Sequence, residues 1–340
     1  TGTLTYTSLL PDVPEADQEF SHVWTNIVTD HGVYFQSNKK IFRWHDGTIK
    51  VWRAEMDDDS RFHLMFHVHN TLYVRQKGVG LMKFLDDQLV VIQGGEIFSD
   101  MDIHFMTDYD GESILLNTKT HGLYLLKPTD PDYYPKDRKN PTQINEIIPF
   151  KTQIDRFFME YHIFSGLKLP DGNFSIGTQG GGIIVIDKDG ALVRVLDKNT
   201  GIQDVIVNAQ YQDDRNNLWL ALENGISKVE INAPITTFDS RTGIEGIVQS
   251  ISRHNGTLYV ATLLGVYYLP HPQDHALETE LTDEDMVAYE HSNFVKLKGI
   301  TTQCWDLLSV TGEGHSTLLV ATNDGIYGID ENNTATFITK

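Results

Sequence analysis

The sequence predicts an all-β fold, a seven-bladed β-propeller of four-stranded antiparallel blades, and three observations lead to it. One hairpin pattern, made of a short apolar strand, a turn, a glycine and a second apolar strand, recurs seven times. Further apolar segments before and after each copy bring the repeat to four strands. The interval between copies alternates between about 40 and about 60 residues, which is typical of propeller blades. No stretch has the period of a long amphipathic helix.

The hairpin pattern is clearest in residues 217–231, NLWLALENGISKVEI. Its strands have about five residues, are rich in Val, Ile, Leu, Tyr and Trp, and are bounded by turn residues. The seven copies span residues 32–44, 71–84, 113–126, 173–186, 217–231, 257–269 and 317–329.

A glycine occupies the same point of the turn in six copies, namely Gly80, Gly122, Gly182, Gly225, Gly265 and Gly325. Glycine is expected there if the backbone needs a positive φ or if another strand passes close to the turn. In the first copy Lys40 stands in its place.

We expect the blades to form a single domain over residues 1–340. An apolar segment such as residues 205–211 precedes each hairpin, and one such as residues 294–297 follows it. Residues 3–9 alternate Thr or Ser with bulkier side chains, so segment 1–19 is a candidate strand that closes the ring against the last blade. A frayed terminus is the alternative. The expected blades are residues 20–56, 62–98, 101–150, 160–201, 205–243, 247–300 and 301–340.

The charge of the chain argues against some partners. The 340 residues include 47 acidic and 27 basic side chains, which gives a formal net charge of −20. Nucleic acid and anionic membrane surfaces are therefore poor partners, and we expect no direct membrane insertion by this segment. A neutral or cationic ligand or a basic protein surface is compatible with the charge. An acidic surface that serves only solubility would give the same composition.

Cysteine usage and hydropathy bear on the compartment. Cys304 is the only cysteine, so no disulfide can form within the chain. This fits the cytosol and also a periplasm in which disulfides are few. No apolar run is long enough to span a membrane, and no secretory signal is visible. Because the chain begins with Thr1 rather than Met, we expect it to be a piece of a longer protein.

Residues 200–230, TGIQDVIVNAQYQDDRNNLWLALENGISKVE, closely resemble the two-component regulator propeller repeat. Phrases in the first half, such as VYFQSNKKIFRW and LYVRQKGVGLMKF, look like the opening blades of bacterial membrane-bound sensors. The resemblance covers residues 20–340 and describes architecture more than chemistry. In such proteins the propeller precedes a small β-sandwich, a membrane span and a histidine kinase or nucleotide cyclase output.

The resemblance implies a periplasmic, extracytoplasmic sensor domain of an inner-membrane protein, coupled to downstream signalling domains of the same chain. A cytoplasmic location is the alternative, since such repeats also occur in soluble transcriptional regulators. The ligand that it implies is an unknown small molecule, glycan or peptide, and a homodimer is compatible with it.

Aligning the seven copies places one hydrogen-bonding side chain at the start of each innermost strand. Innermost strands surround the axial channel of a propeller, so we expect these side chains to form a polar, partly aromatic cup at one mouth of the channel. This candidate ligand-binding set, the mouth row, is Trp24, His63, His104, His162, Asn208, Gln249 and Trp305.

Other uses of the mouth row remain open at this point. The same position can point between blades, where polar groups satisfy neighbouring backbone. His63, His104 and His162 fall in consecutive blades, but no aligned carboxylate or Cys supplies a fourth ligand, so we expect no metal site. We expect no cofactor and no catalytic residue, because the sequence has no G-x-S-x-G, H-E-x-x-H or Walker-type motif.

Two long insertions fall between the third and fourth strands of their blades. They are residues 127–145, with Tyr133 and Tyr134 among prolines, and the acidic residues 270–293. Such connections emerge on the face opposite the mouth row, and long loops often carry function. We interpret them as a protein-contact face, with disordered decoration as the alternative.

The sequence as a whole favours ligand sensing without catalysis. One alternative is a propeller enzyme acting on carbohydrate, a lyase or glycosidase, which requires a tight acid–base cluster at one mouth. The other is a pure protein-interaction scaffold.

Overall fold

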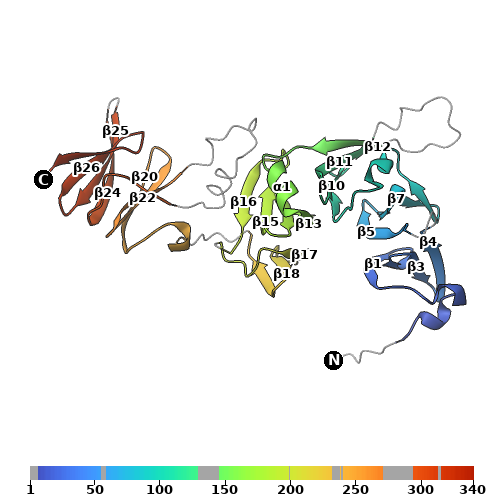
Figure 1. The fold of residues 1–340 in the computed structure, drawn as a ribbon. Helices are drawn as coiled ribbons and strands as arrows, with labels where there is room; N and C mark the ends of the chain where they lie inside the picture. The colour runs from blue at the N-terminus through green and yellow to red at the C-terminus, as the bar shows by residue number, and fades with distance from the viewer. Residues whose placement is uncertain are drawn as a thin grey trace.

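The structure, a computed structural model, describes residues 7–54, 59–128, 145–198, 200–231, 238, 240–270, 294–312 and 315–340. These residues form seven antiparallel sheets, each from strands consecutive in the chain (Figure 1). Six sheets have four strands and the fifth has three within the described ranges, because the expected fourth strand there falls mostly in residues 232–237. The all-β fold class is confirmed.

The first three sheets alternate short strands with tight turns. Sheet 1 contains β1 (Val23–Thr29), β2 (Gly32–Ser37), β3 (Lys40–His45) and β4 (Thr48–Arg53). Sheet 2 contains β5 (Phe62–Val68), β6 (Thr71–Gln76), β7 (Gly80–Leu85) and β8 (Gln88–Val91). Sheet 3 contains β9 (Met106–Asp108), β10 (Ile114–Thr118), β11 (Gly122–Pro128) and β12 (Asn145–Phe150).

The last four sheets repeat the arrangement. Sheet 4 contains β13 (Ile163–Lys168), β14 (Phe174–Thr178), β15 (Ile183–Ile186) and β16 (Leu192–Leu196), and sheet 5 contains β17 (Val207–Gln212), β18 (Leu218–Leu222) and β19 (Ile226–Val229). Sheet 6 contains β20 (Val248–His254), β21 (Thr257–Thr262), β22 (Gly265–Leu269) and β23 (Val295–Lys296). Sheet 7 contains β24 (Cys304–Gly312), β25 (His315–Thr322), β26 (Gly325–Ile329) and β27 (Ala335–Thr339).

In the part of the chain that the structure describes, helical structure is confined to short connections. One α-helix, α1 (Asp155–Tyr161), lies between sheets 3 and 4 and buries Phe157 and Phe158. Ahead of the helix, the backbone N–H and the hydroxyl of Thr152 both donate to Asp155 Oδ1. With seven residues it is too short to give the sequence an amphipathic period, which is why the sequence did not predict it. The 3₁₀ turns are η1 (Leu10–Asp12), η2 (Glu15–Asp17), η3 (Gly95–Phe98) and η4 (Ser240–Thr242).

The described part of the N-terminal segment packs on sheet 1. Asp17 has no exposed surface, and its carboxylate accepts hydrogen bonds from Arg53 and pairs with Lys40. Residues 7–9 are in no strand, and residues 1–6 lie outside the described residues. A ring-closing strand therefore stays a prediction for residues 1–6.

Apolar cores lie between consecutive sheets. Strand β1 contacts β5, β5 contacts β9, β9 contacts β13, β13 contacts β17, and β20 contacts β24. Within the described ranges, no comparably extensive contact joins the strands of sheet 5 to those of sheet 6 or the strands of sheet 7 to those of sheet 1, and no buried apolar cluster includes strands of both sheets of either pair. Figure 1 accordingly shows the sheets along an open arc with the first and last far apart. Ring closure, which a closed propeller requires, stays a prediction.

The repeated glycines behave as the sequence predicts. All six have a positive φ, from +73° at Gly182 to +137° at Gly325. At Gly182 and Gly325 a Cβ atom would lie 2.2 and 2.3 Å from carbonyl oxygens of the outermost strand region. Lys40, which stands in the place of the glycine in the first hairpin, has no positive φ.

Candidate functional site

A β-bulge opens the innermost strand of most sheets. Pairing with the second strand skips one residue between Val23 and Thr25 of β1 and between Cys304 and Asp306 of β24, for example. Register shifts at the same point occur in β5, β13, β17 and β20. The skipped residue is left without a strand partner and its side chain is re-aimed. The bulge therefore leaves one unpaired position at the start of the innermost strand in five sheets and two, His63 and Leu64, in sheet 2, whereas β9 of sheet 3 has no such shift.

Five members of the mouth row occupy these bulges, namely Trp24, His63, Asn208, Gln249 and Trp305. His104 lies just ahead of β9, where Asn117 Oδ1 accepts hydrogen bonds from the backbone N–H groups of His104 and Phe105. His104 follows the fully buried Ile103, just as each of the five bulge residues follows the apolar residue that begins its strand.

His162 does not occupy the equivalent position. It follows α1, with a φ of +49°, and the bulge of sheet 4 falls between Ile163 and Ser165. The bulged residue of this sheet is therefore Phe164. The alignment placed the position two residues too early, because α1 supplied an unexpected apolar residue, Tyr161, before His162.

Among the described residues, two members of the mouth row pack ring to ring, His63 of sheet 2 and His104 of sheet 3, and Phe164 of sheet 4 packs beside them. The His63 and His104 rings are 5.0 Å apart edge to face, and the His104 and Phe164 rings are 4.6 Å apart. His63 Nδ1 donates to the carbonyl of Ile103 at 2.9 Å, whereas both ring nitrogens of His104 are buried without a hydrogen-bond partner. Burial, and then the neighbouring His63, lower the pKa of His104 to about 4, and burial lowers the pKa of His63. Both rings are therefore neutral at pH 7.

The two tryptophans of the row are held by their own sheets. Trp24 Nε1 donates to Asn38 at 2.6 Å, and Trp305 Nε1 donates to Asn323 at 2.7 Å. Their rings remain 59% and 48% exposed, so each presents a fixed aromatic face. Asn208 and Gln249 are exposed, and no extensive packing between the described strands of sheets 5 and 6 brings them together.

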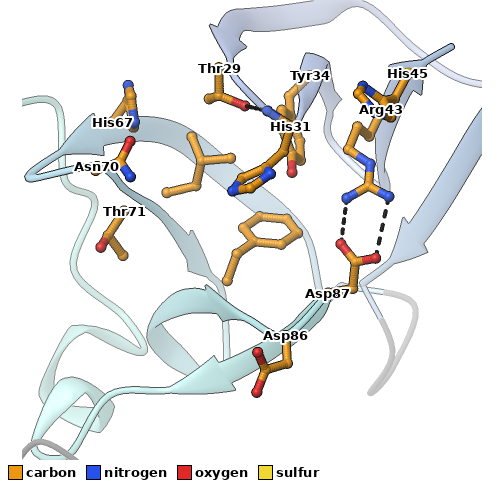
Figure 2. A pocket seen from close by; sticks show the side chains of 12 residues that line it. Thr29, His31, Tyr34, Arg43, His45, His67, Asn70, Thr71, Asp86 and Asp87 are labelled. Atoms are coloured by element: carbon orange, nitrogen blue, oxygen red, sulfur yellow. Dashed lines mark hydrogen bonds and ion pairs between the residues drawn. The ribbon is translucent and has the colours of Figure 1, made fainter.

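A cavity of about 560 Å³ lies at the other end of the inner strands, between sheets 1 and 2. Figure 2 shows side chains from the turns of both sheets around it. Its floor is apolar, from Tyr34, Leu72 and Phe84, and the polar lining comes from Thr29, His31, Arg43, His45, His67, Asn70, Thr71, Asp86 and Asp87. This size and mixture of apolar and hydrogen-bonding groups are those of small-molecule sites.

Asp87, in the β7–β8 turn, connects sheet 2 to side chains of sheet 1 along one wall of this cavity. Its carboxylate accepts two hydrogen bonds from Arg43, as Figure 2 shows, and pairs with Lys50 at 3.2 Å. Its carbonyl accepts one from Trp52 Nε1 at 3.0 Å. The hydrogen bond from Arg43 lowers the pKa of Asp87, so the pair stays ionised. The Trp52 and Phe84 rings pack edge to face at 5.0 Å behind it.

A second charged cluster joins three sheets at the same end of the inner strands. Asp108 accepts from His69 Nε2 at 2.6 Å and from Lys168 Nζ at 2.7 Å. Lys168 also donates to the carbonyl of Tyr109 at 2.8 Å. Burial would raise the pKa of Asp108, but the hydrogen bonds from Lys168 and His69 outweigh it and lower the pKa to about 2. The cluster acts as an ionic clamp between sheets 2, 3 and 4.

Metal chemistry finds no support among the described residues, where no group of three His, Cys, Asp or Glu side chains could hold an ion. The two insertions lie almost entirely in residues 129–144 and 271–293, outside the described ranges, but they do connect third to fourth strands, β11 to β12 and β22 to β23. Connections of this type, β3–β4 and β7–β8, also border the cavity.

Sequence reasoning missed the cavity. Its residues come from four turns, and each turn alone has an ordinary composition for a hairpin. The one available indication was that His31, His45 and His67 all lie at strand ends of the first two repeats.

Comparisons with known proteins support the fold. The structure is similar to the extracellular domain of a hybrid two component system, BT3049, from B. thetaiotaomicron, with a TM-score of 0.55 and 16% identity over 95% of this chain and 40% of that one. BT4673 from the same organism gives a TM-score of 0.47 and 14% identity, over 94% and 41%. A virginiamycin B lyase from Staphylococcus aureus gives 0.43 and 14%, over 71% and 77%. No family model and no curated protein matches the sequence.

The first of these similarities, together with the repeated sheets, shows a β-propeller fold. At this identity it shows the fold alone. The chain spans about two fifths of the length of the extracellular domains it resembles. In the described ranges no helix has the length and apolar character needed to cross a bilayer.

Proposed function

We propose that this chain is a non-catalytic, ligand-sensing propeller segment of a bacterial signal-transduction protein, situated outside the cytoplasm. The observation that carries the proposal is the fold similarity, over 95% of the chain, to the extracellular domain of a two component system. The resemblance of residues 200–230 to the two-component regulator propeller repeat points to the same assignment, while no family model matches the chain. The output domain would lie in a part of the protein beyond this chain.

The cavity between sheets 1 and 2 is the ligand site that the geometry supports best. Two charged side chains of its lining, Arg43 and Asp87, form an ion pair with each other and are hydrogen-bonded together. What remains for a ligand is the apolar floor with imidazole, amide and hydroxyl groups and the Asp86 carboxylate around it. A neutral, hydrogen-bonding ligand with an apolar face, a short glycan or peptide segment, fits this lining.

A ligand in this cavity touches both sheets at once, because the lining alternates between the turns of sheet 1 and those of sheet 2. Binding therefore favours arrangements in which the two sheets keep this spacing. Such a difference in affinity between arrangements is what allows occupancy to bias a downstream domain.

The proposal is tested by a thermal-shift screen of oligosaccharides and peptides, followed by variants at both surfaces. We expect His31→Ala and His67→Ala to weaken binding of a confirmed ligand at least tenfold, and Val193→Ala, on an exposed outer strand, to leave it unchanged. Trp24→Ala and Trp305→Ala test the mouth row in the same assay. A ligand that loses affinity only in the tryptophan variants would move the site to the mouth row, and a library without any ligand would remove the sensing proposal.

An enzyme acting on carbohydrate is the second candidate, and the cluster of His69, Asp108 and Lys168 is the observation that favours it. These acid–base groups lie within hydrogen-bond reach of each other at one end of the inner strands. A pKa of about 2 makes Asp108 a weak base near pH 7, where efficient general catalysts have a pKa near the working pH. Turnover of a bound glycan that Asp108→Asn abolishes would establish the enzyme instead.

A further inference from the structure

Two hairpin turns of sheet 2 border the cavity and lack the glycine that such turns prefer. The β5–β6 turn consists of His69 and Asn70, and the β7–β8 turn consists of Asp86 and Asp87. All four residues have a positive φ, between +47° and +62°. Positive φ at both residues of a two-residue turn is characteristic of type I′, in which glycine is preferred at the second position. Asn70 and Asp87 stand in that position here.

The other turns of this kind have the preferred composition. Among the residues that the structure describes, positive φ at both residues of a two-residue turn occurs also at residues 46–47 and 255–256. Both of these turns end in glycine, at Gly47 and Gly256. An L-residue in the left-handed region is less favourable than glycine, although Asn and Asp tolerate it best. A side chain kept at such a position against this preference indicates a use for the side chain itself.

Two of the four side chains have a use inside the protein. His69 Nε2 is hydrogen-bonded to Asp108 of sheet 3 at 2.6 Å. Asp87 accepts hydrogen bonds from Arg43 of sheet 1. It also pairs with Lys50 of the same sheet at 3.2 Å. Each of these side chains therefore connects its turn to a neighbouring sheet, which accounts for the absence of glycine.

The other two side chains, Asn70 and Asp86, have no use of this kind. Within the described ranges neither makes a hydrogen bond or an ion pair, both are exposed, and both line the cavity. Figure 2 shows them on the two separate turns of sheet 2. Asn70 stands where the turn prefers glycine, so contacts within the protein do not account for it. What it contributes is an amide group at the wall of the cavity.

The charges around the cavity leave the Asp86 carboxylate without a counterion. Arg43 and Lys50 both pair with Asp87. Both also lie over the Trp52 ring, at 5.6 and 5.1 Å from its centroid. Among the described residues no other lysine or arginine lines the cavity. An acidic group that enters it therefore meets the Asp86 carboxylate with no free cation to offset the repulsion, and like charges placed together in a site discriminate strongly against a ligand.

Asn70 and Asp86 differ in the groups that they can bind. A carboxylate only accepts hydrogen bonds, whereas an amide both donates and accepts them. Asp86 therefore suits a hydroxyl or an amino group, and hydrogen bonds to a charged acceptor are stronger than those between neutral groups. The apolar floor, which includes Leu72 and Phe84, is available to an apolar face of the same ligand.

We propose that Asn70 and Asp86 determine which ligand the cavity accepts, and that they select a ligand with hydroxyl or amino donors and no acidic group. This inference rests on the proposed function and specifies the chemistry of its ligand. The Asn70 amide orients the ligand, and the Asp86 carboxylate accepts from its donors and repels acidic analogues. Specificity of this kind comes from the unfavourable contact of the wrong ligand as well as from the favourable contact of the right one.

Asn70→Gly separates a binding role from a structural one. Glycine is the residue that the turn prefers, so we expect the urea midpoint of unfolding to equal or exceed that of the parent. We expect the affinity for an oligosaccharide or peptide found in the thermal-shift screen to fall at least about tenfold, because the amide contact is lost. Asn216→Gly is the matched control, since Asn216 also has a positive φ, +63°, in an exposed turn of sheet 5. The control should leave the affinity unchanged.

Asp86→Asn tests the role of the charge. The probes are matched pairs: each oligosaccharide with its form oxidised at the primary hydroxyls to a uronate, and each peptide with Gln or Glu at one position. We expect the parent to bind the neutral member at least about tenfold more tightly than the acidic one, and Asp86→Asn to reduce this ratio to about threefold or less. Asp214→Asn, in an exposed turn of sheet 5, is the matched control and should keep the ratio of the parent.

The outcomes separate this inference from the sensing proposal. A ligand whose affinity depends on His31 and His67 but not on Asn70 would overturn the inference and leave sensing intact. So would a neutral and an acidic probe that the parent binds equally well, or a ratio that Asp86→Asn does not change. A library without any ligand would remove the sensing proposal and this inference together.

Discussion

His104 illustrates how the fold uses a polar side chain without pairing it. Its ring packs between those of His63, edge to face, and Phe164, and neither ring nitrogen has a hydrogen-bond partner. A buried, unpaired imidazole stays neutral, because charging it would cost desolvation that no partner offsets. At neutral pH His104 therefore contributes to stability only through the packing of its ring. Its protonation affects stability only when the pH falls.

The lowered pKa of His104 predicts a loss of stability in mild acid. Above pH 6.5 the ring is neutral in the folded and unfolded chains. Between pH 6.5 and about 4 only the unfolded chain binds the proton, so the free energy of unfolding falls by up to about 3 kcal/mol. We expect His104→Phe, which keeps the aromatic stack, to flatten this part of the profile. Urea unfolding at pH 7.5, 6, 5 and 4.5 measures it.

His121→Phe, at an exposed turn, is the control for losing a histidine. Asp108 acts in a separate window, since a carboxylate with a pKa lowered to about 2 loses its contribution only as the pH falls below about 4. A His104→Phe profile as steep as that of the parent between pH 6.5 and 4 would contradict the assignment of this slope to His104.

At the scale of the element, the hairpin between the second and third strands is the recurring structural unit. A Ser or Thr ends the second strand in five sheets, and its hydroxyl donates to a backbone carbonyl at the start of the third strand. The residues are Ser37, Thr118, Thr178, Thr262 and Thr322. Together with the glycine of positive φ they fix the turn, so the register of both strands follows.

Two glycines of this turn separate the effect of φ from that of close approach. Gly182 and Gly122 have φ of +73° and +78°, but a Cβ would lie 2.2 Å from the Leu196 carbonyl oxygen at Gly182 and would meet nothing within 4 Å at Gly122. We expect Gly122→Ala to cost about 1 kcal/mol and Gly182→Ala about 3 kcal/mol, because β16 must shift. Equal losses in urea unfolding would show that the close approach has no energetic consequence.

At the scale of the whole molecule, each sheet is stabilised by its neighbours in the chain. This resembles a repeat array more than a domain with one central core, because the apolar clusters lie between consecutive sheets. The ends of such an array carry unsatisfied apolar faces. In this chain exposed apolar side chains mark such faces at two places, Tyr211 and Ile226 on sheet 5 and Leu308 and Val310 on sheet 7, and the predicted ring closure would cover both.

Small-angle X-ray scattering distinguishes the arc from the ring. A compact molecule of this length has a radius of gyration of about 20 Å, and an open arc has a larger one. We expect the parent protein to give the compact value and Tyr211→Lys to expand it, because a charge on the sheet 5 face opposes docking of β20. Gln88→Lys, at an exposed position of the outer strand β8, is the matched control. A parent protein as extended as the Tyr211→Lys variant would contradict closure.

The local pattern of apolar residues, turn residues and glycines determined the strands, their grouping into seven sheets and the all-β class, because strand period and turn conformation depend on near neighbours in the chain. It also located most of the mouth row, since a bulge after an apolar strand-starting residue repeats with the sheet. In sheet 4 the bulged residue is Phe164 rather than His162, because α1, which lies outside the repeat, precedes the innermost strand. The cavity depends on turns of sheets 1 and 2 being brought together by sheet packing, and the clamp at Asp108 on partners 39 and 60 residues away along the chain. Only the tertiary structure could decide those contacts, because sequence spacing does not encode which turns meet.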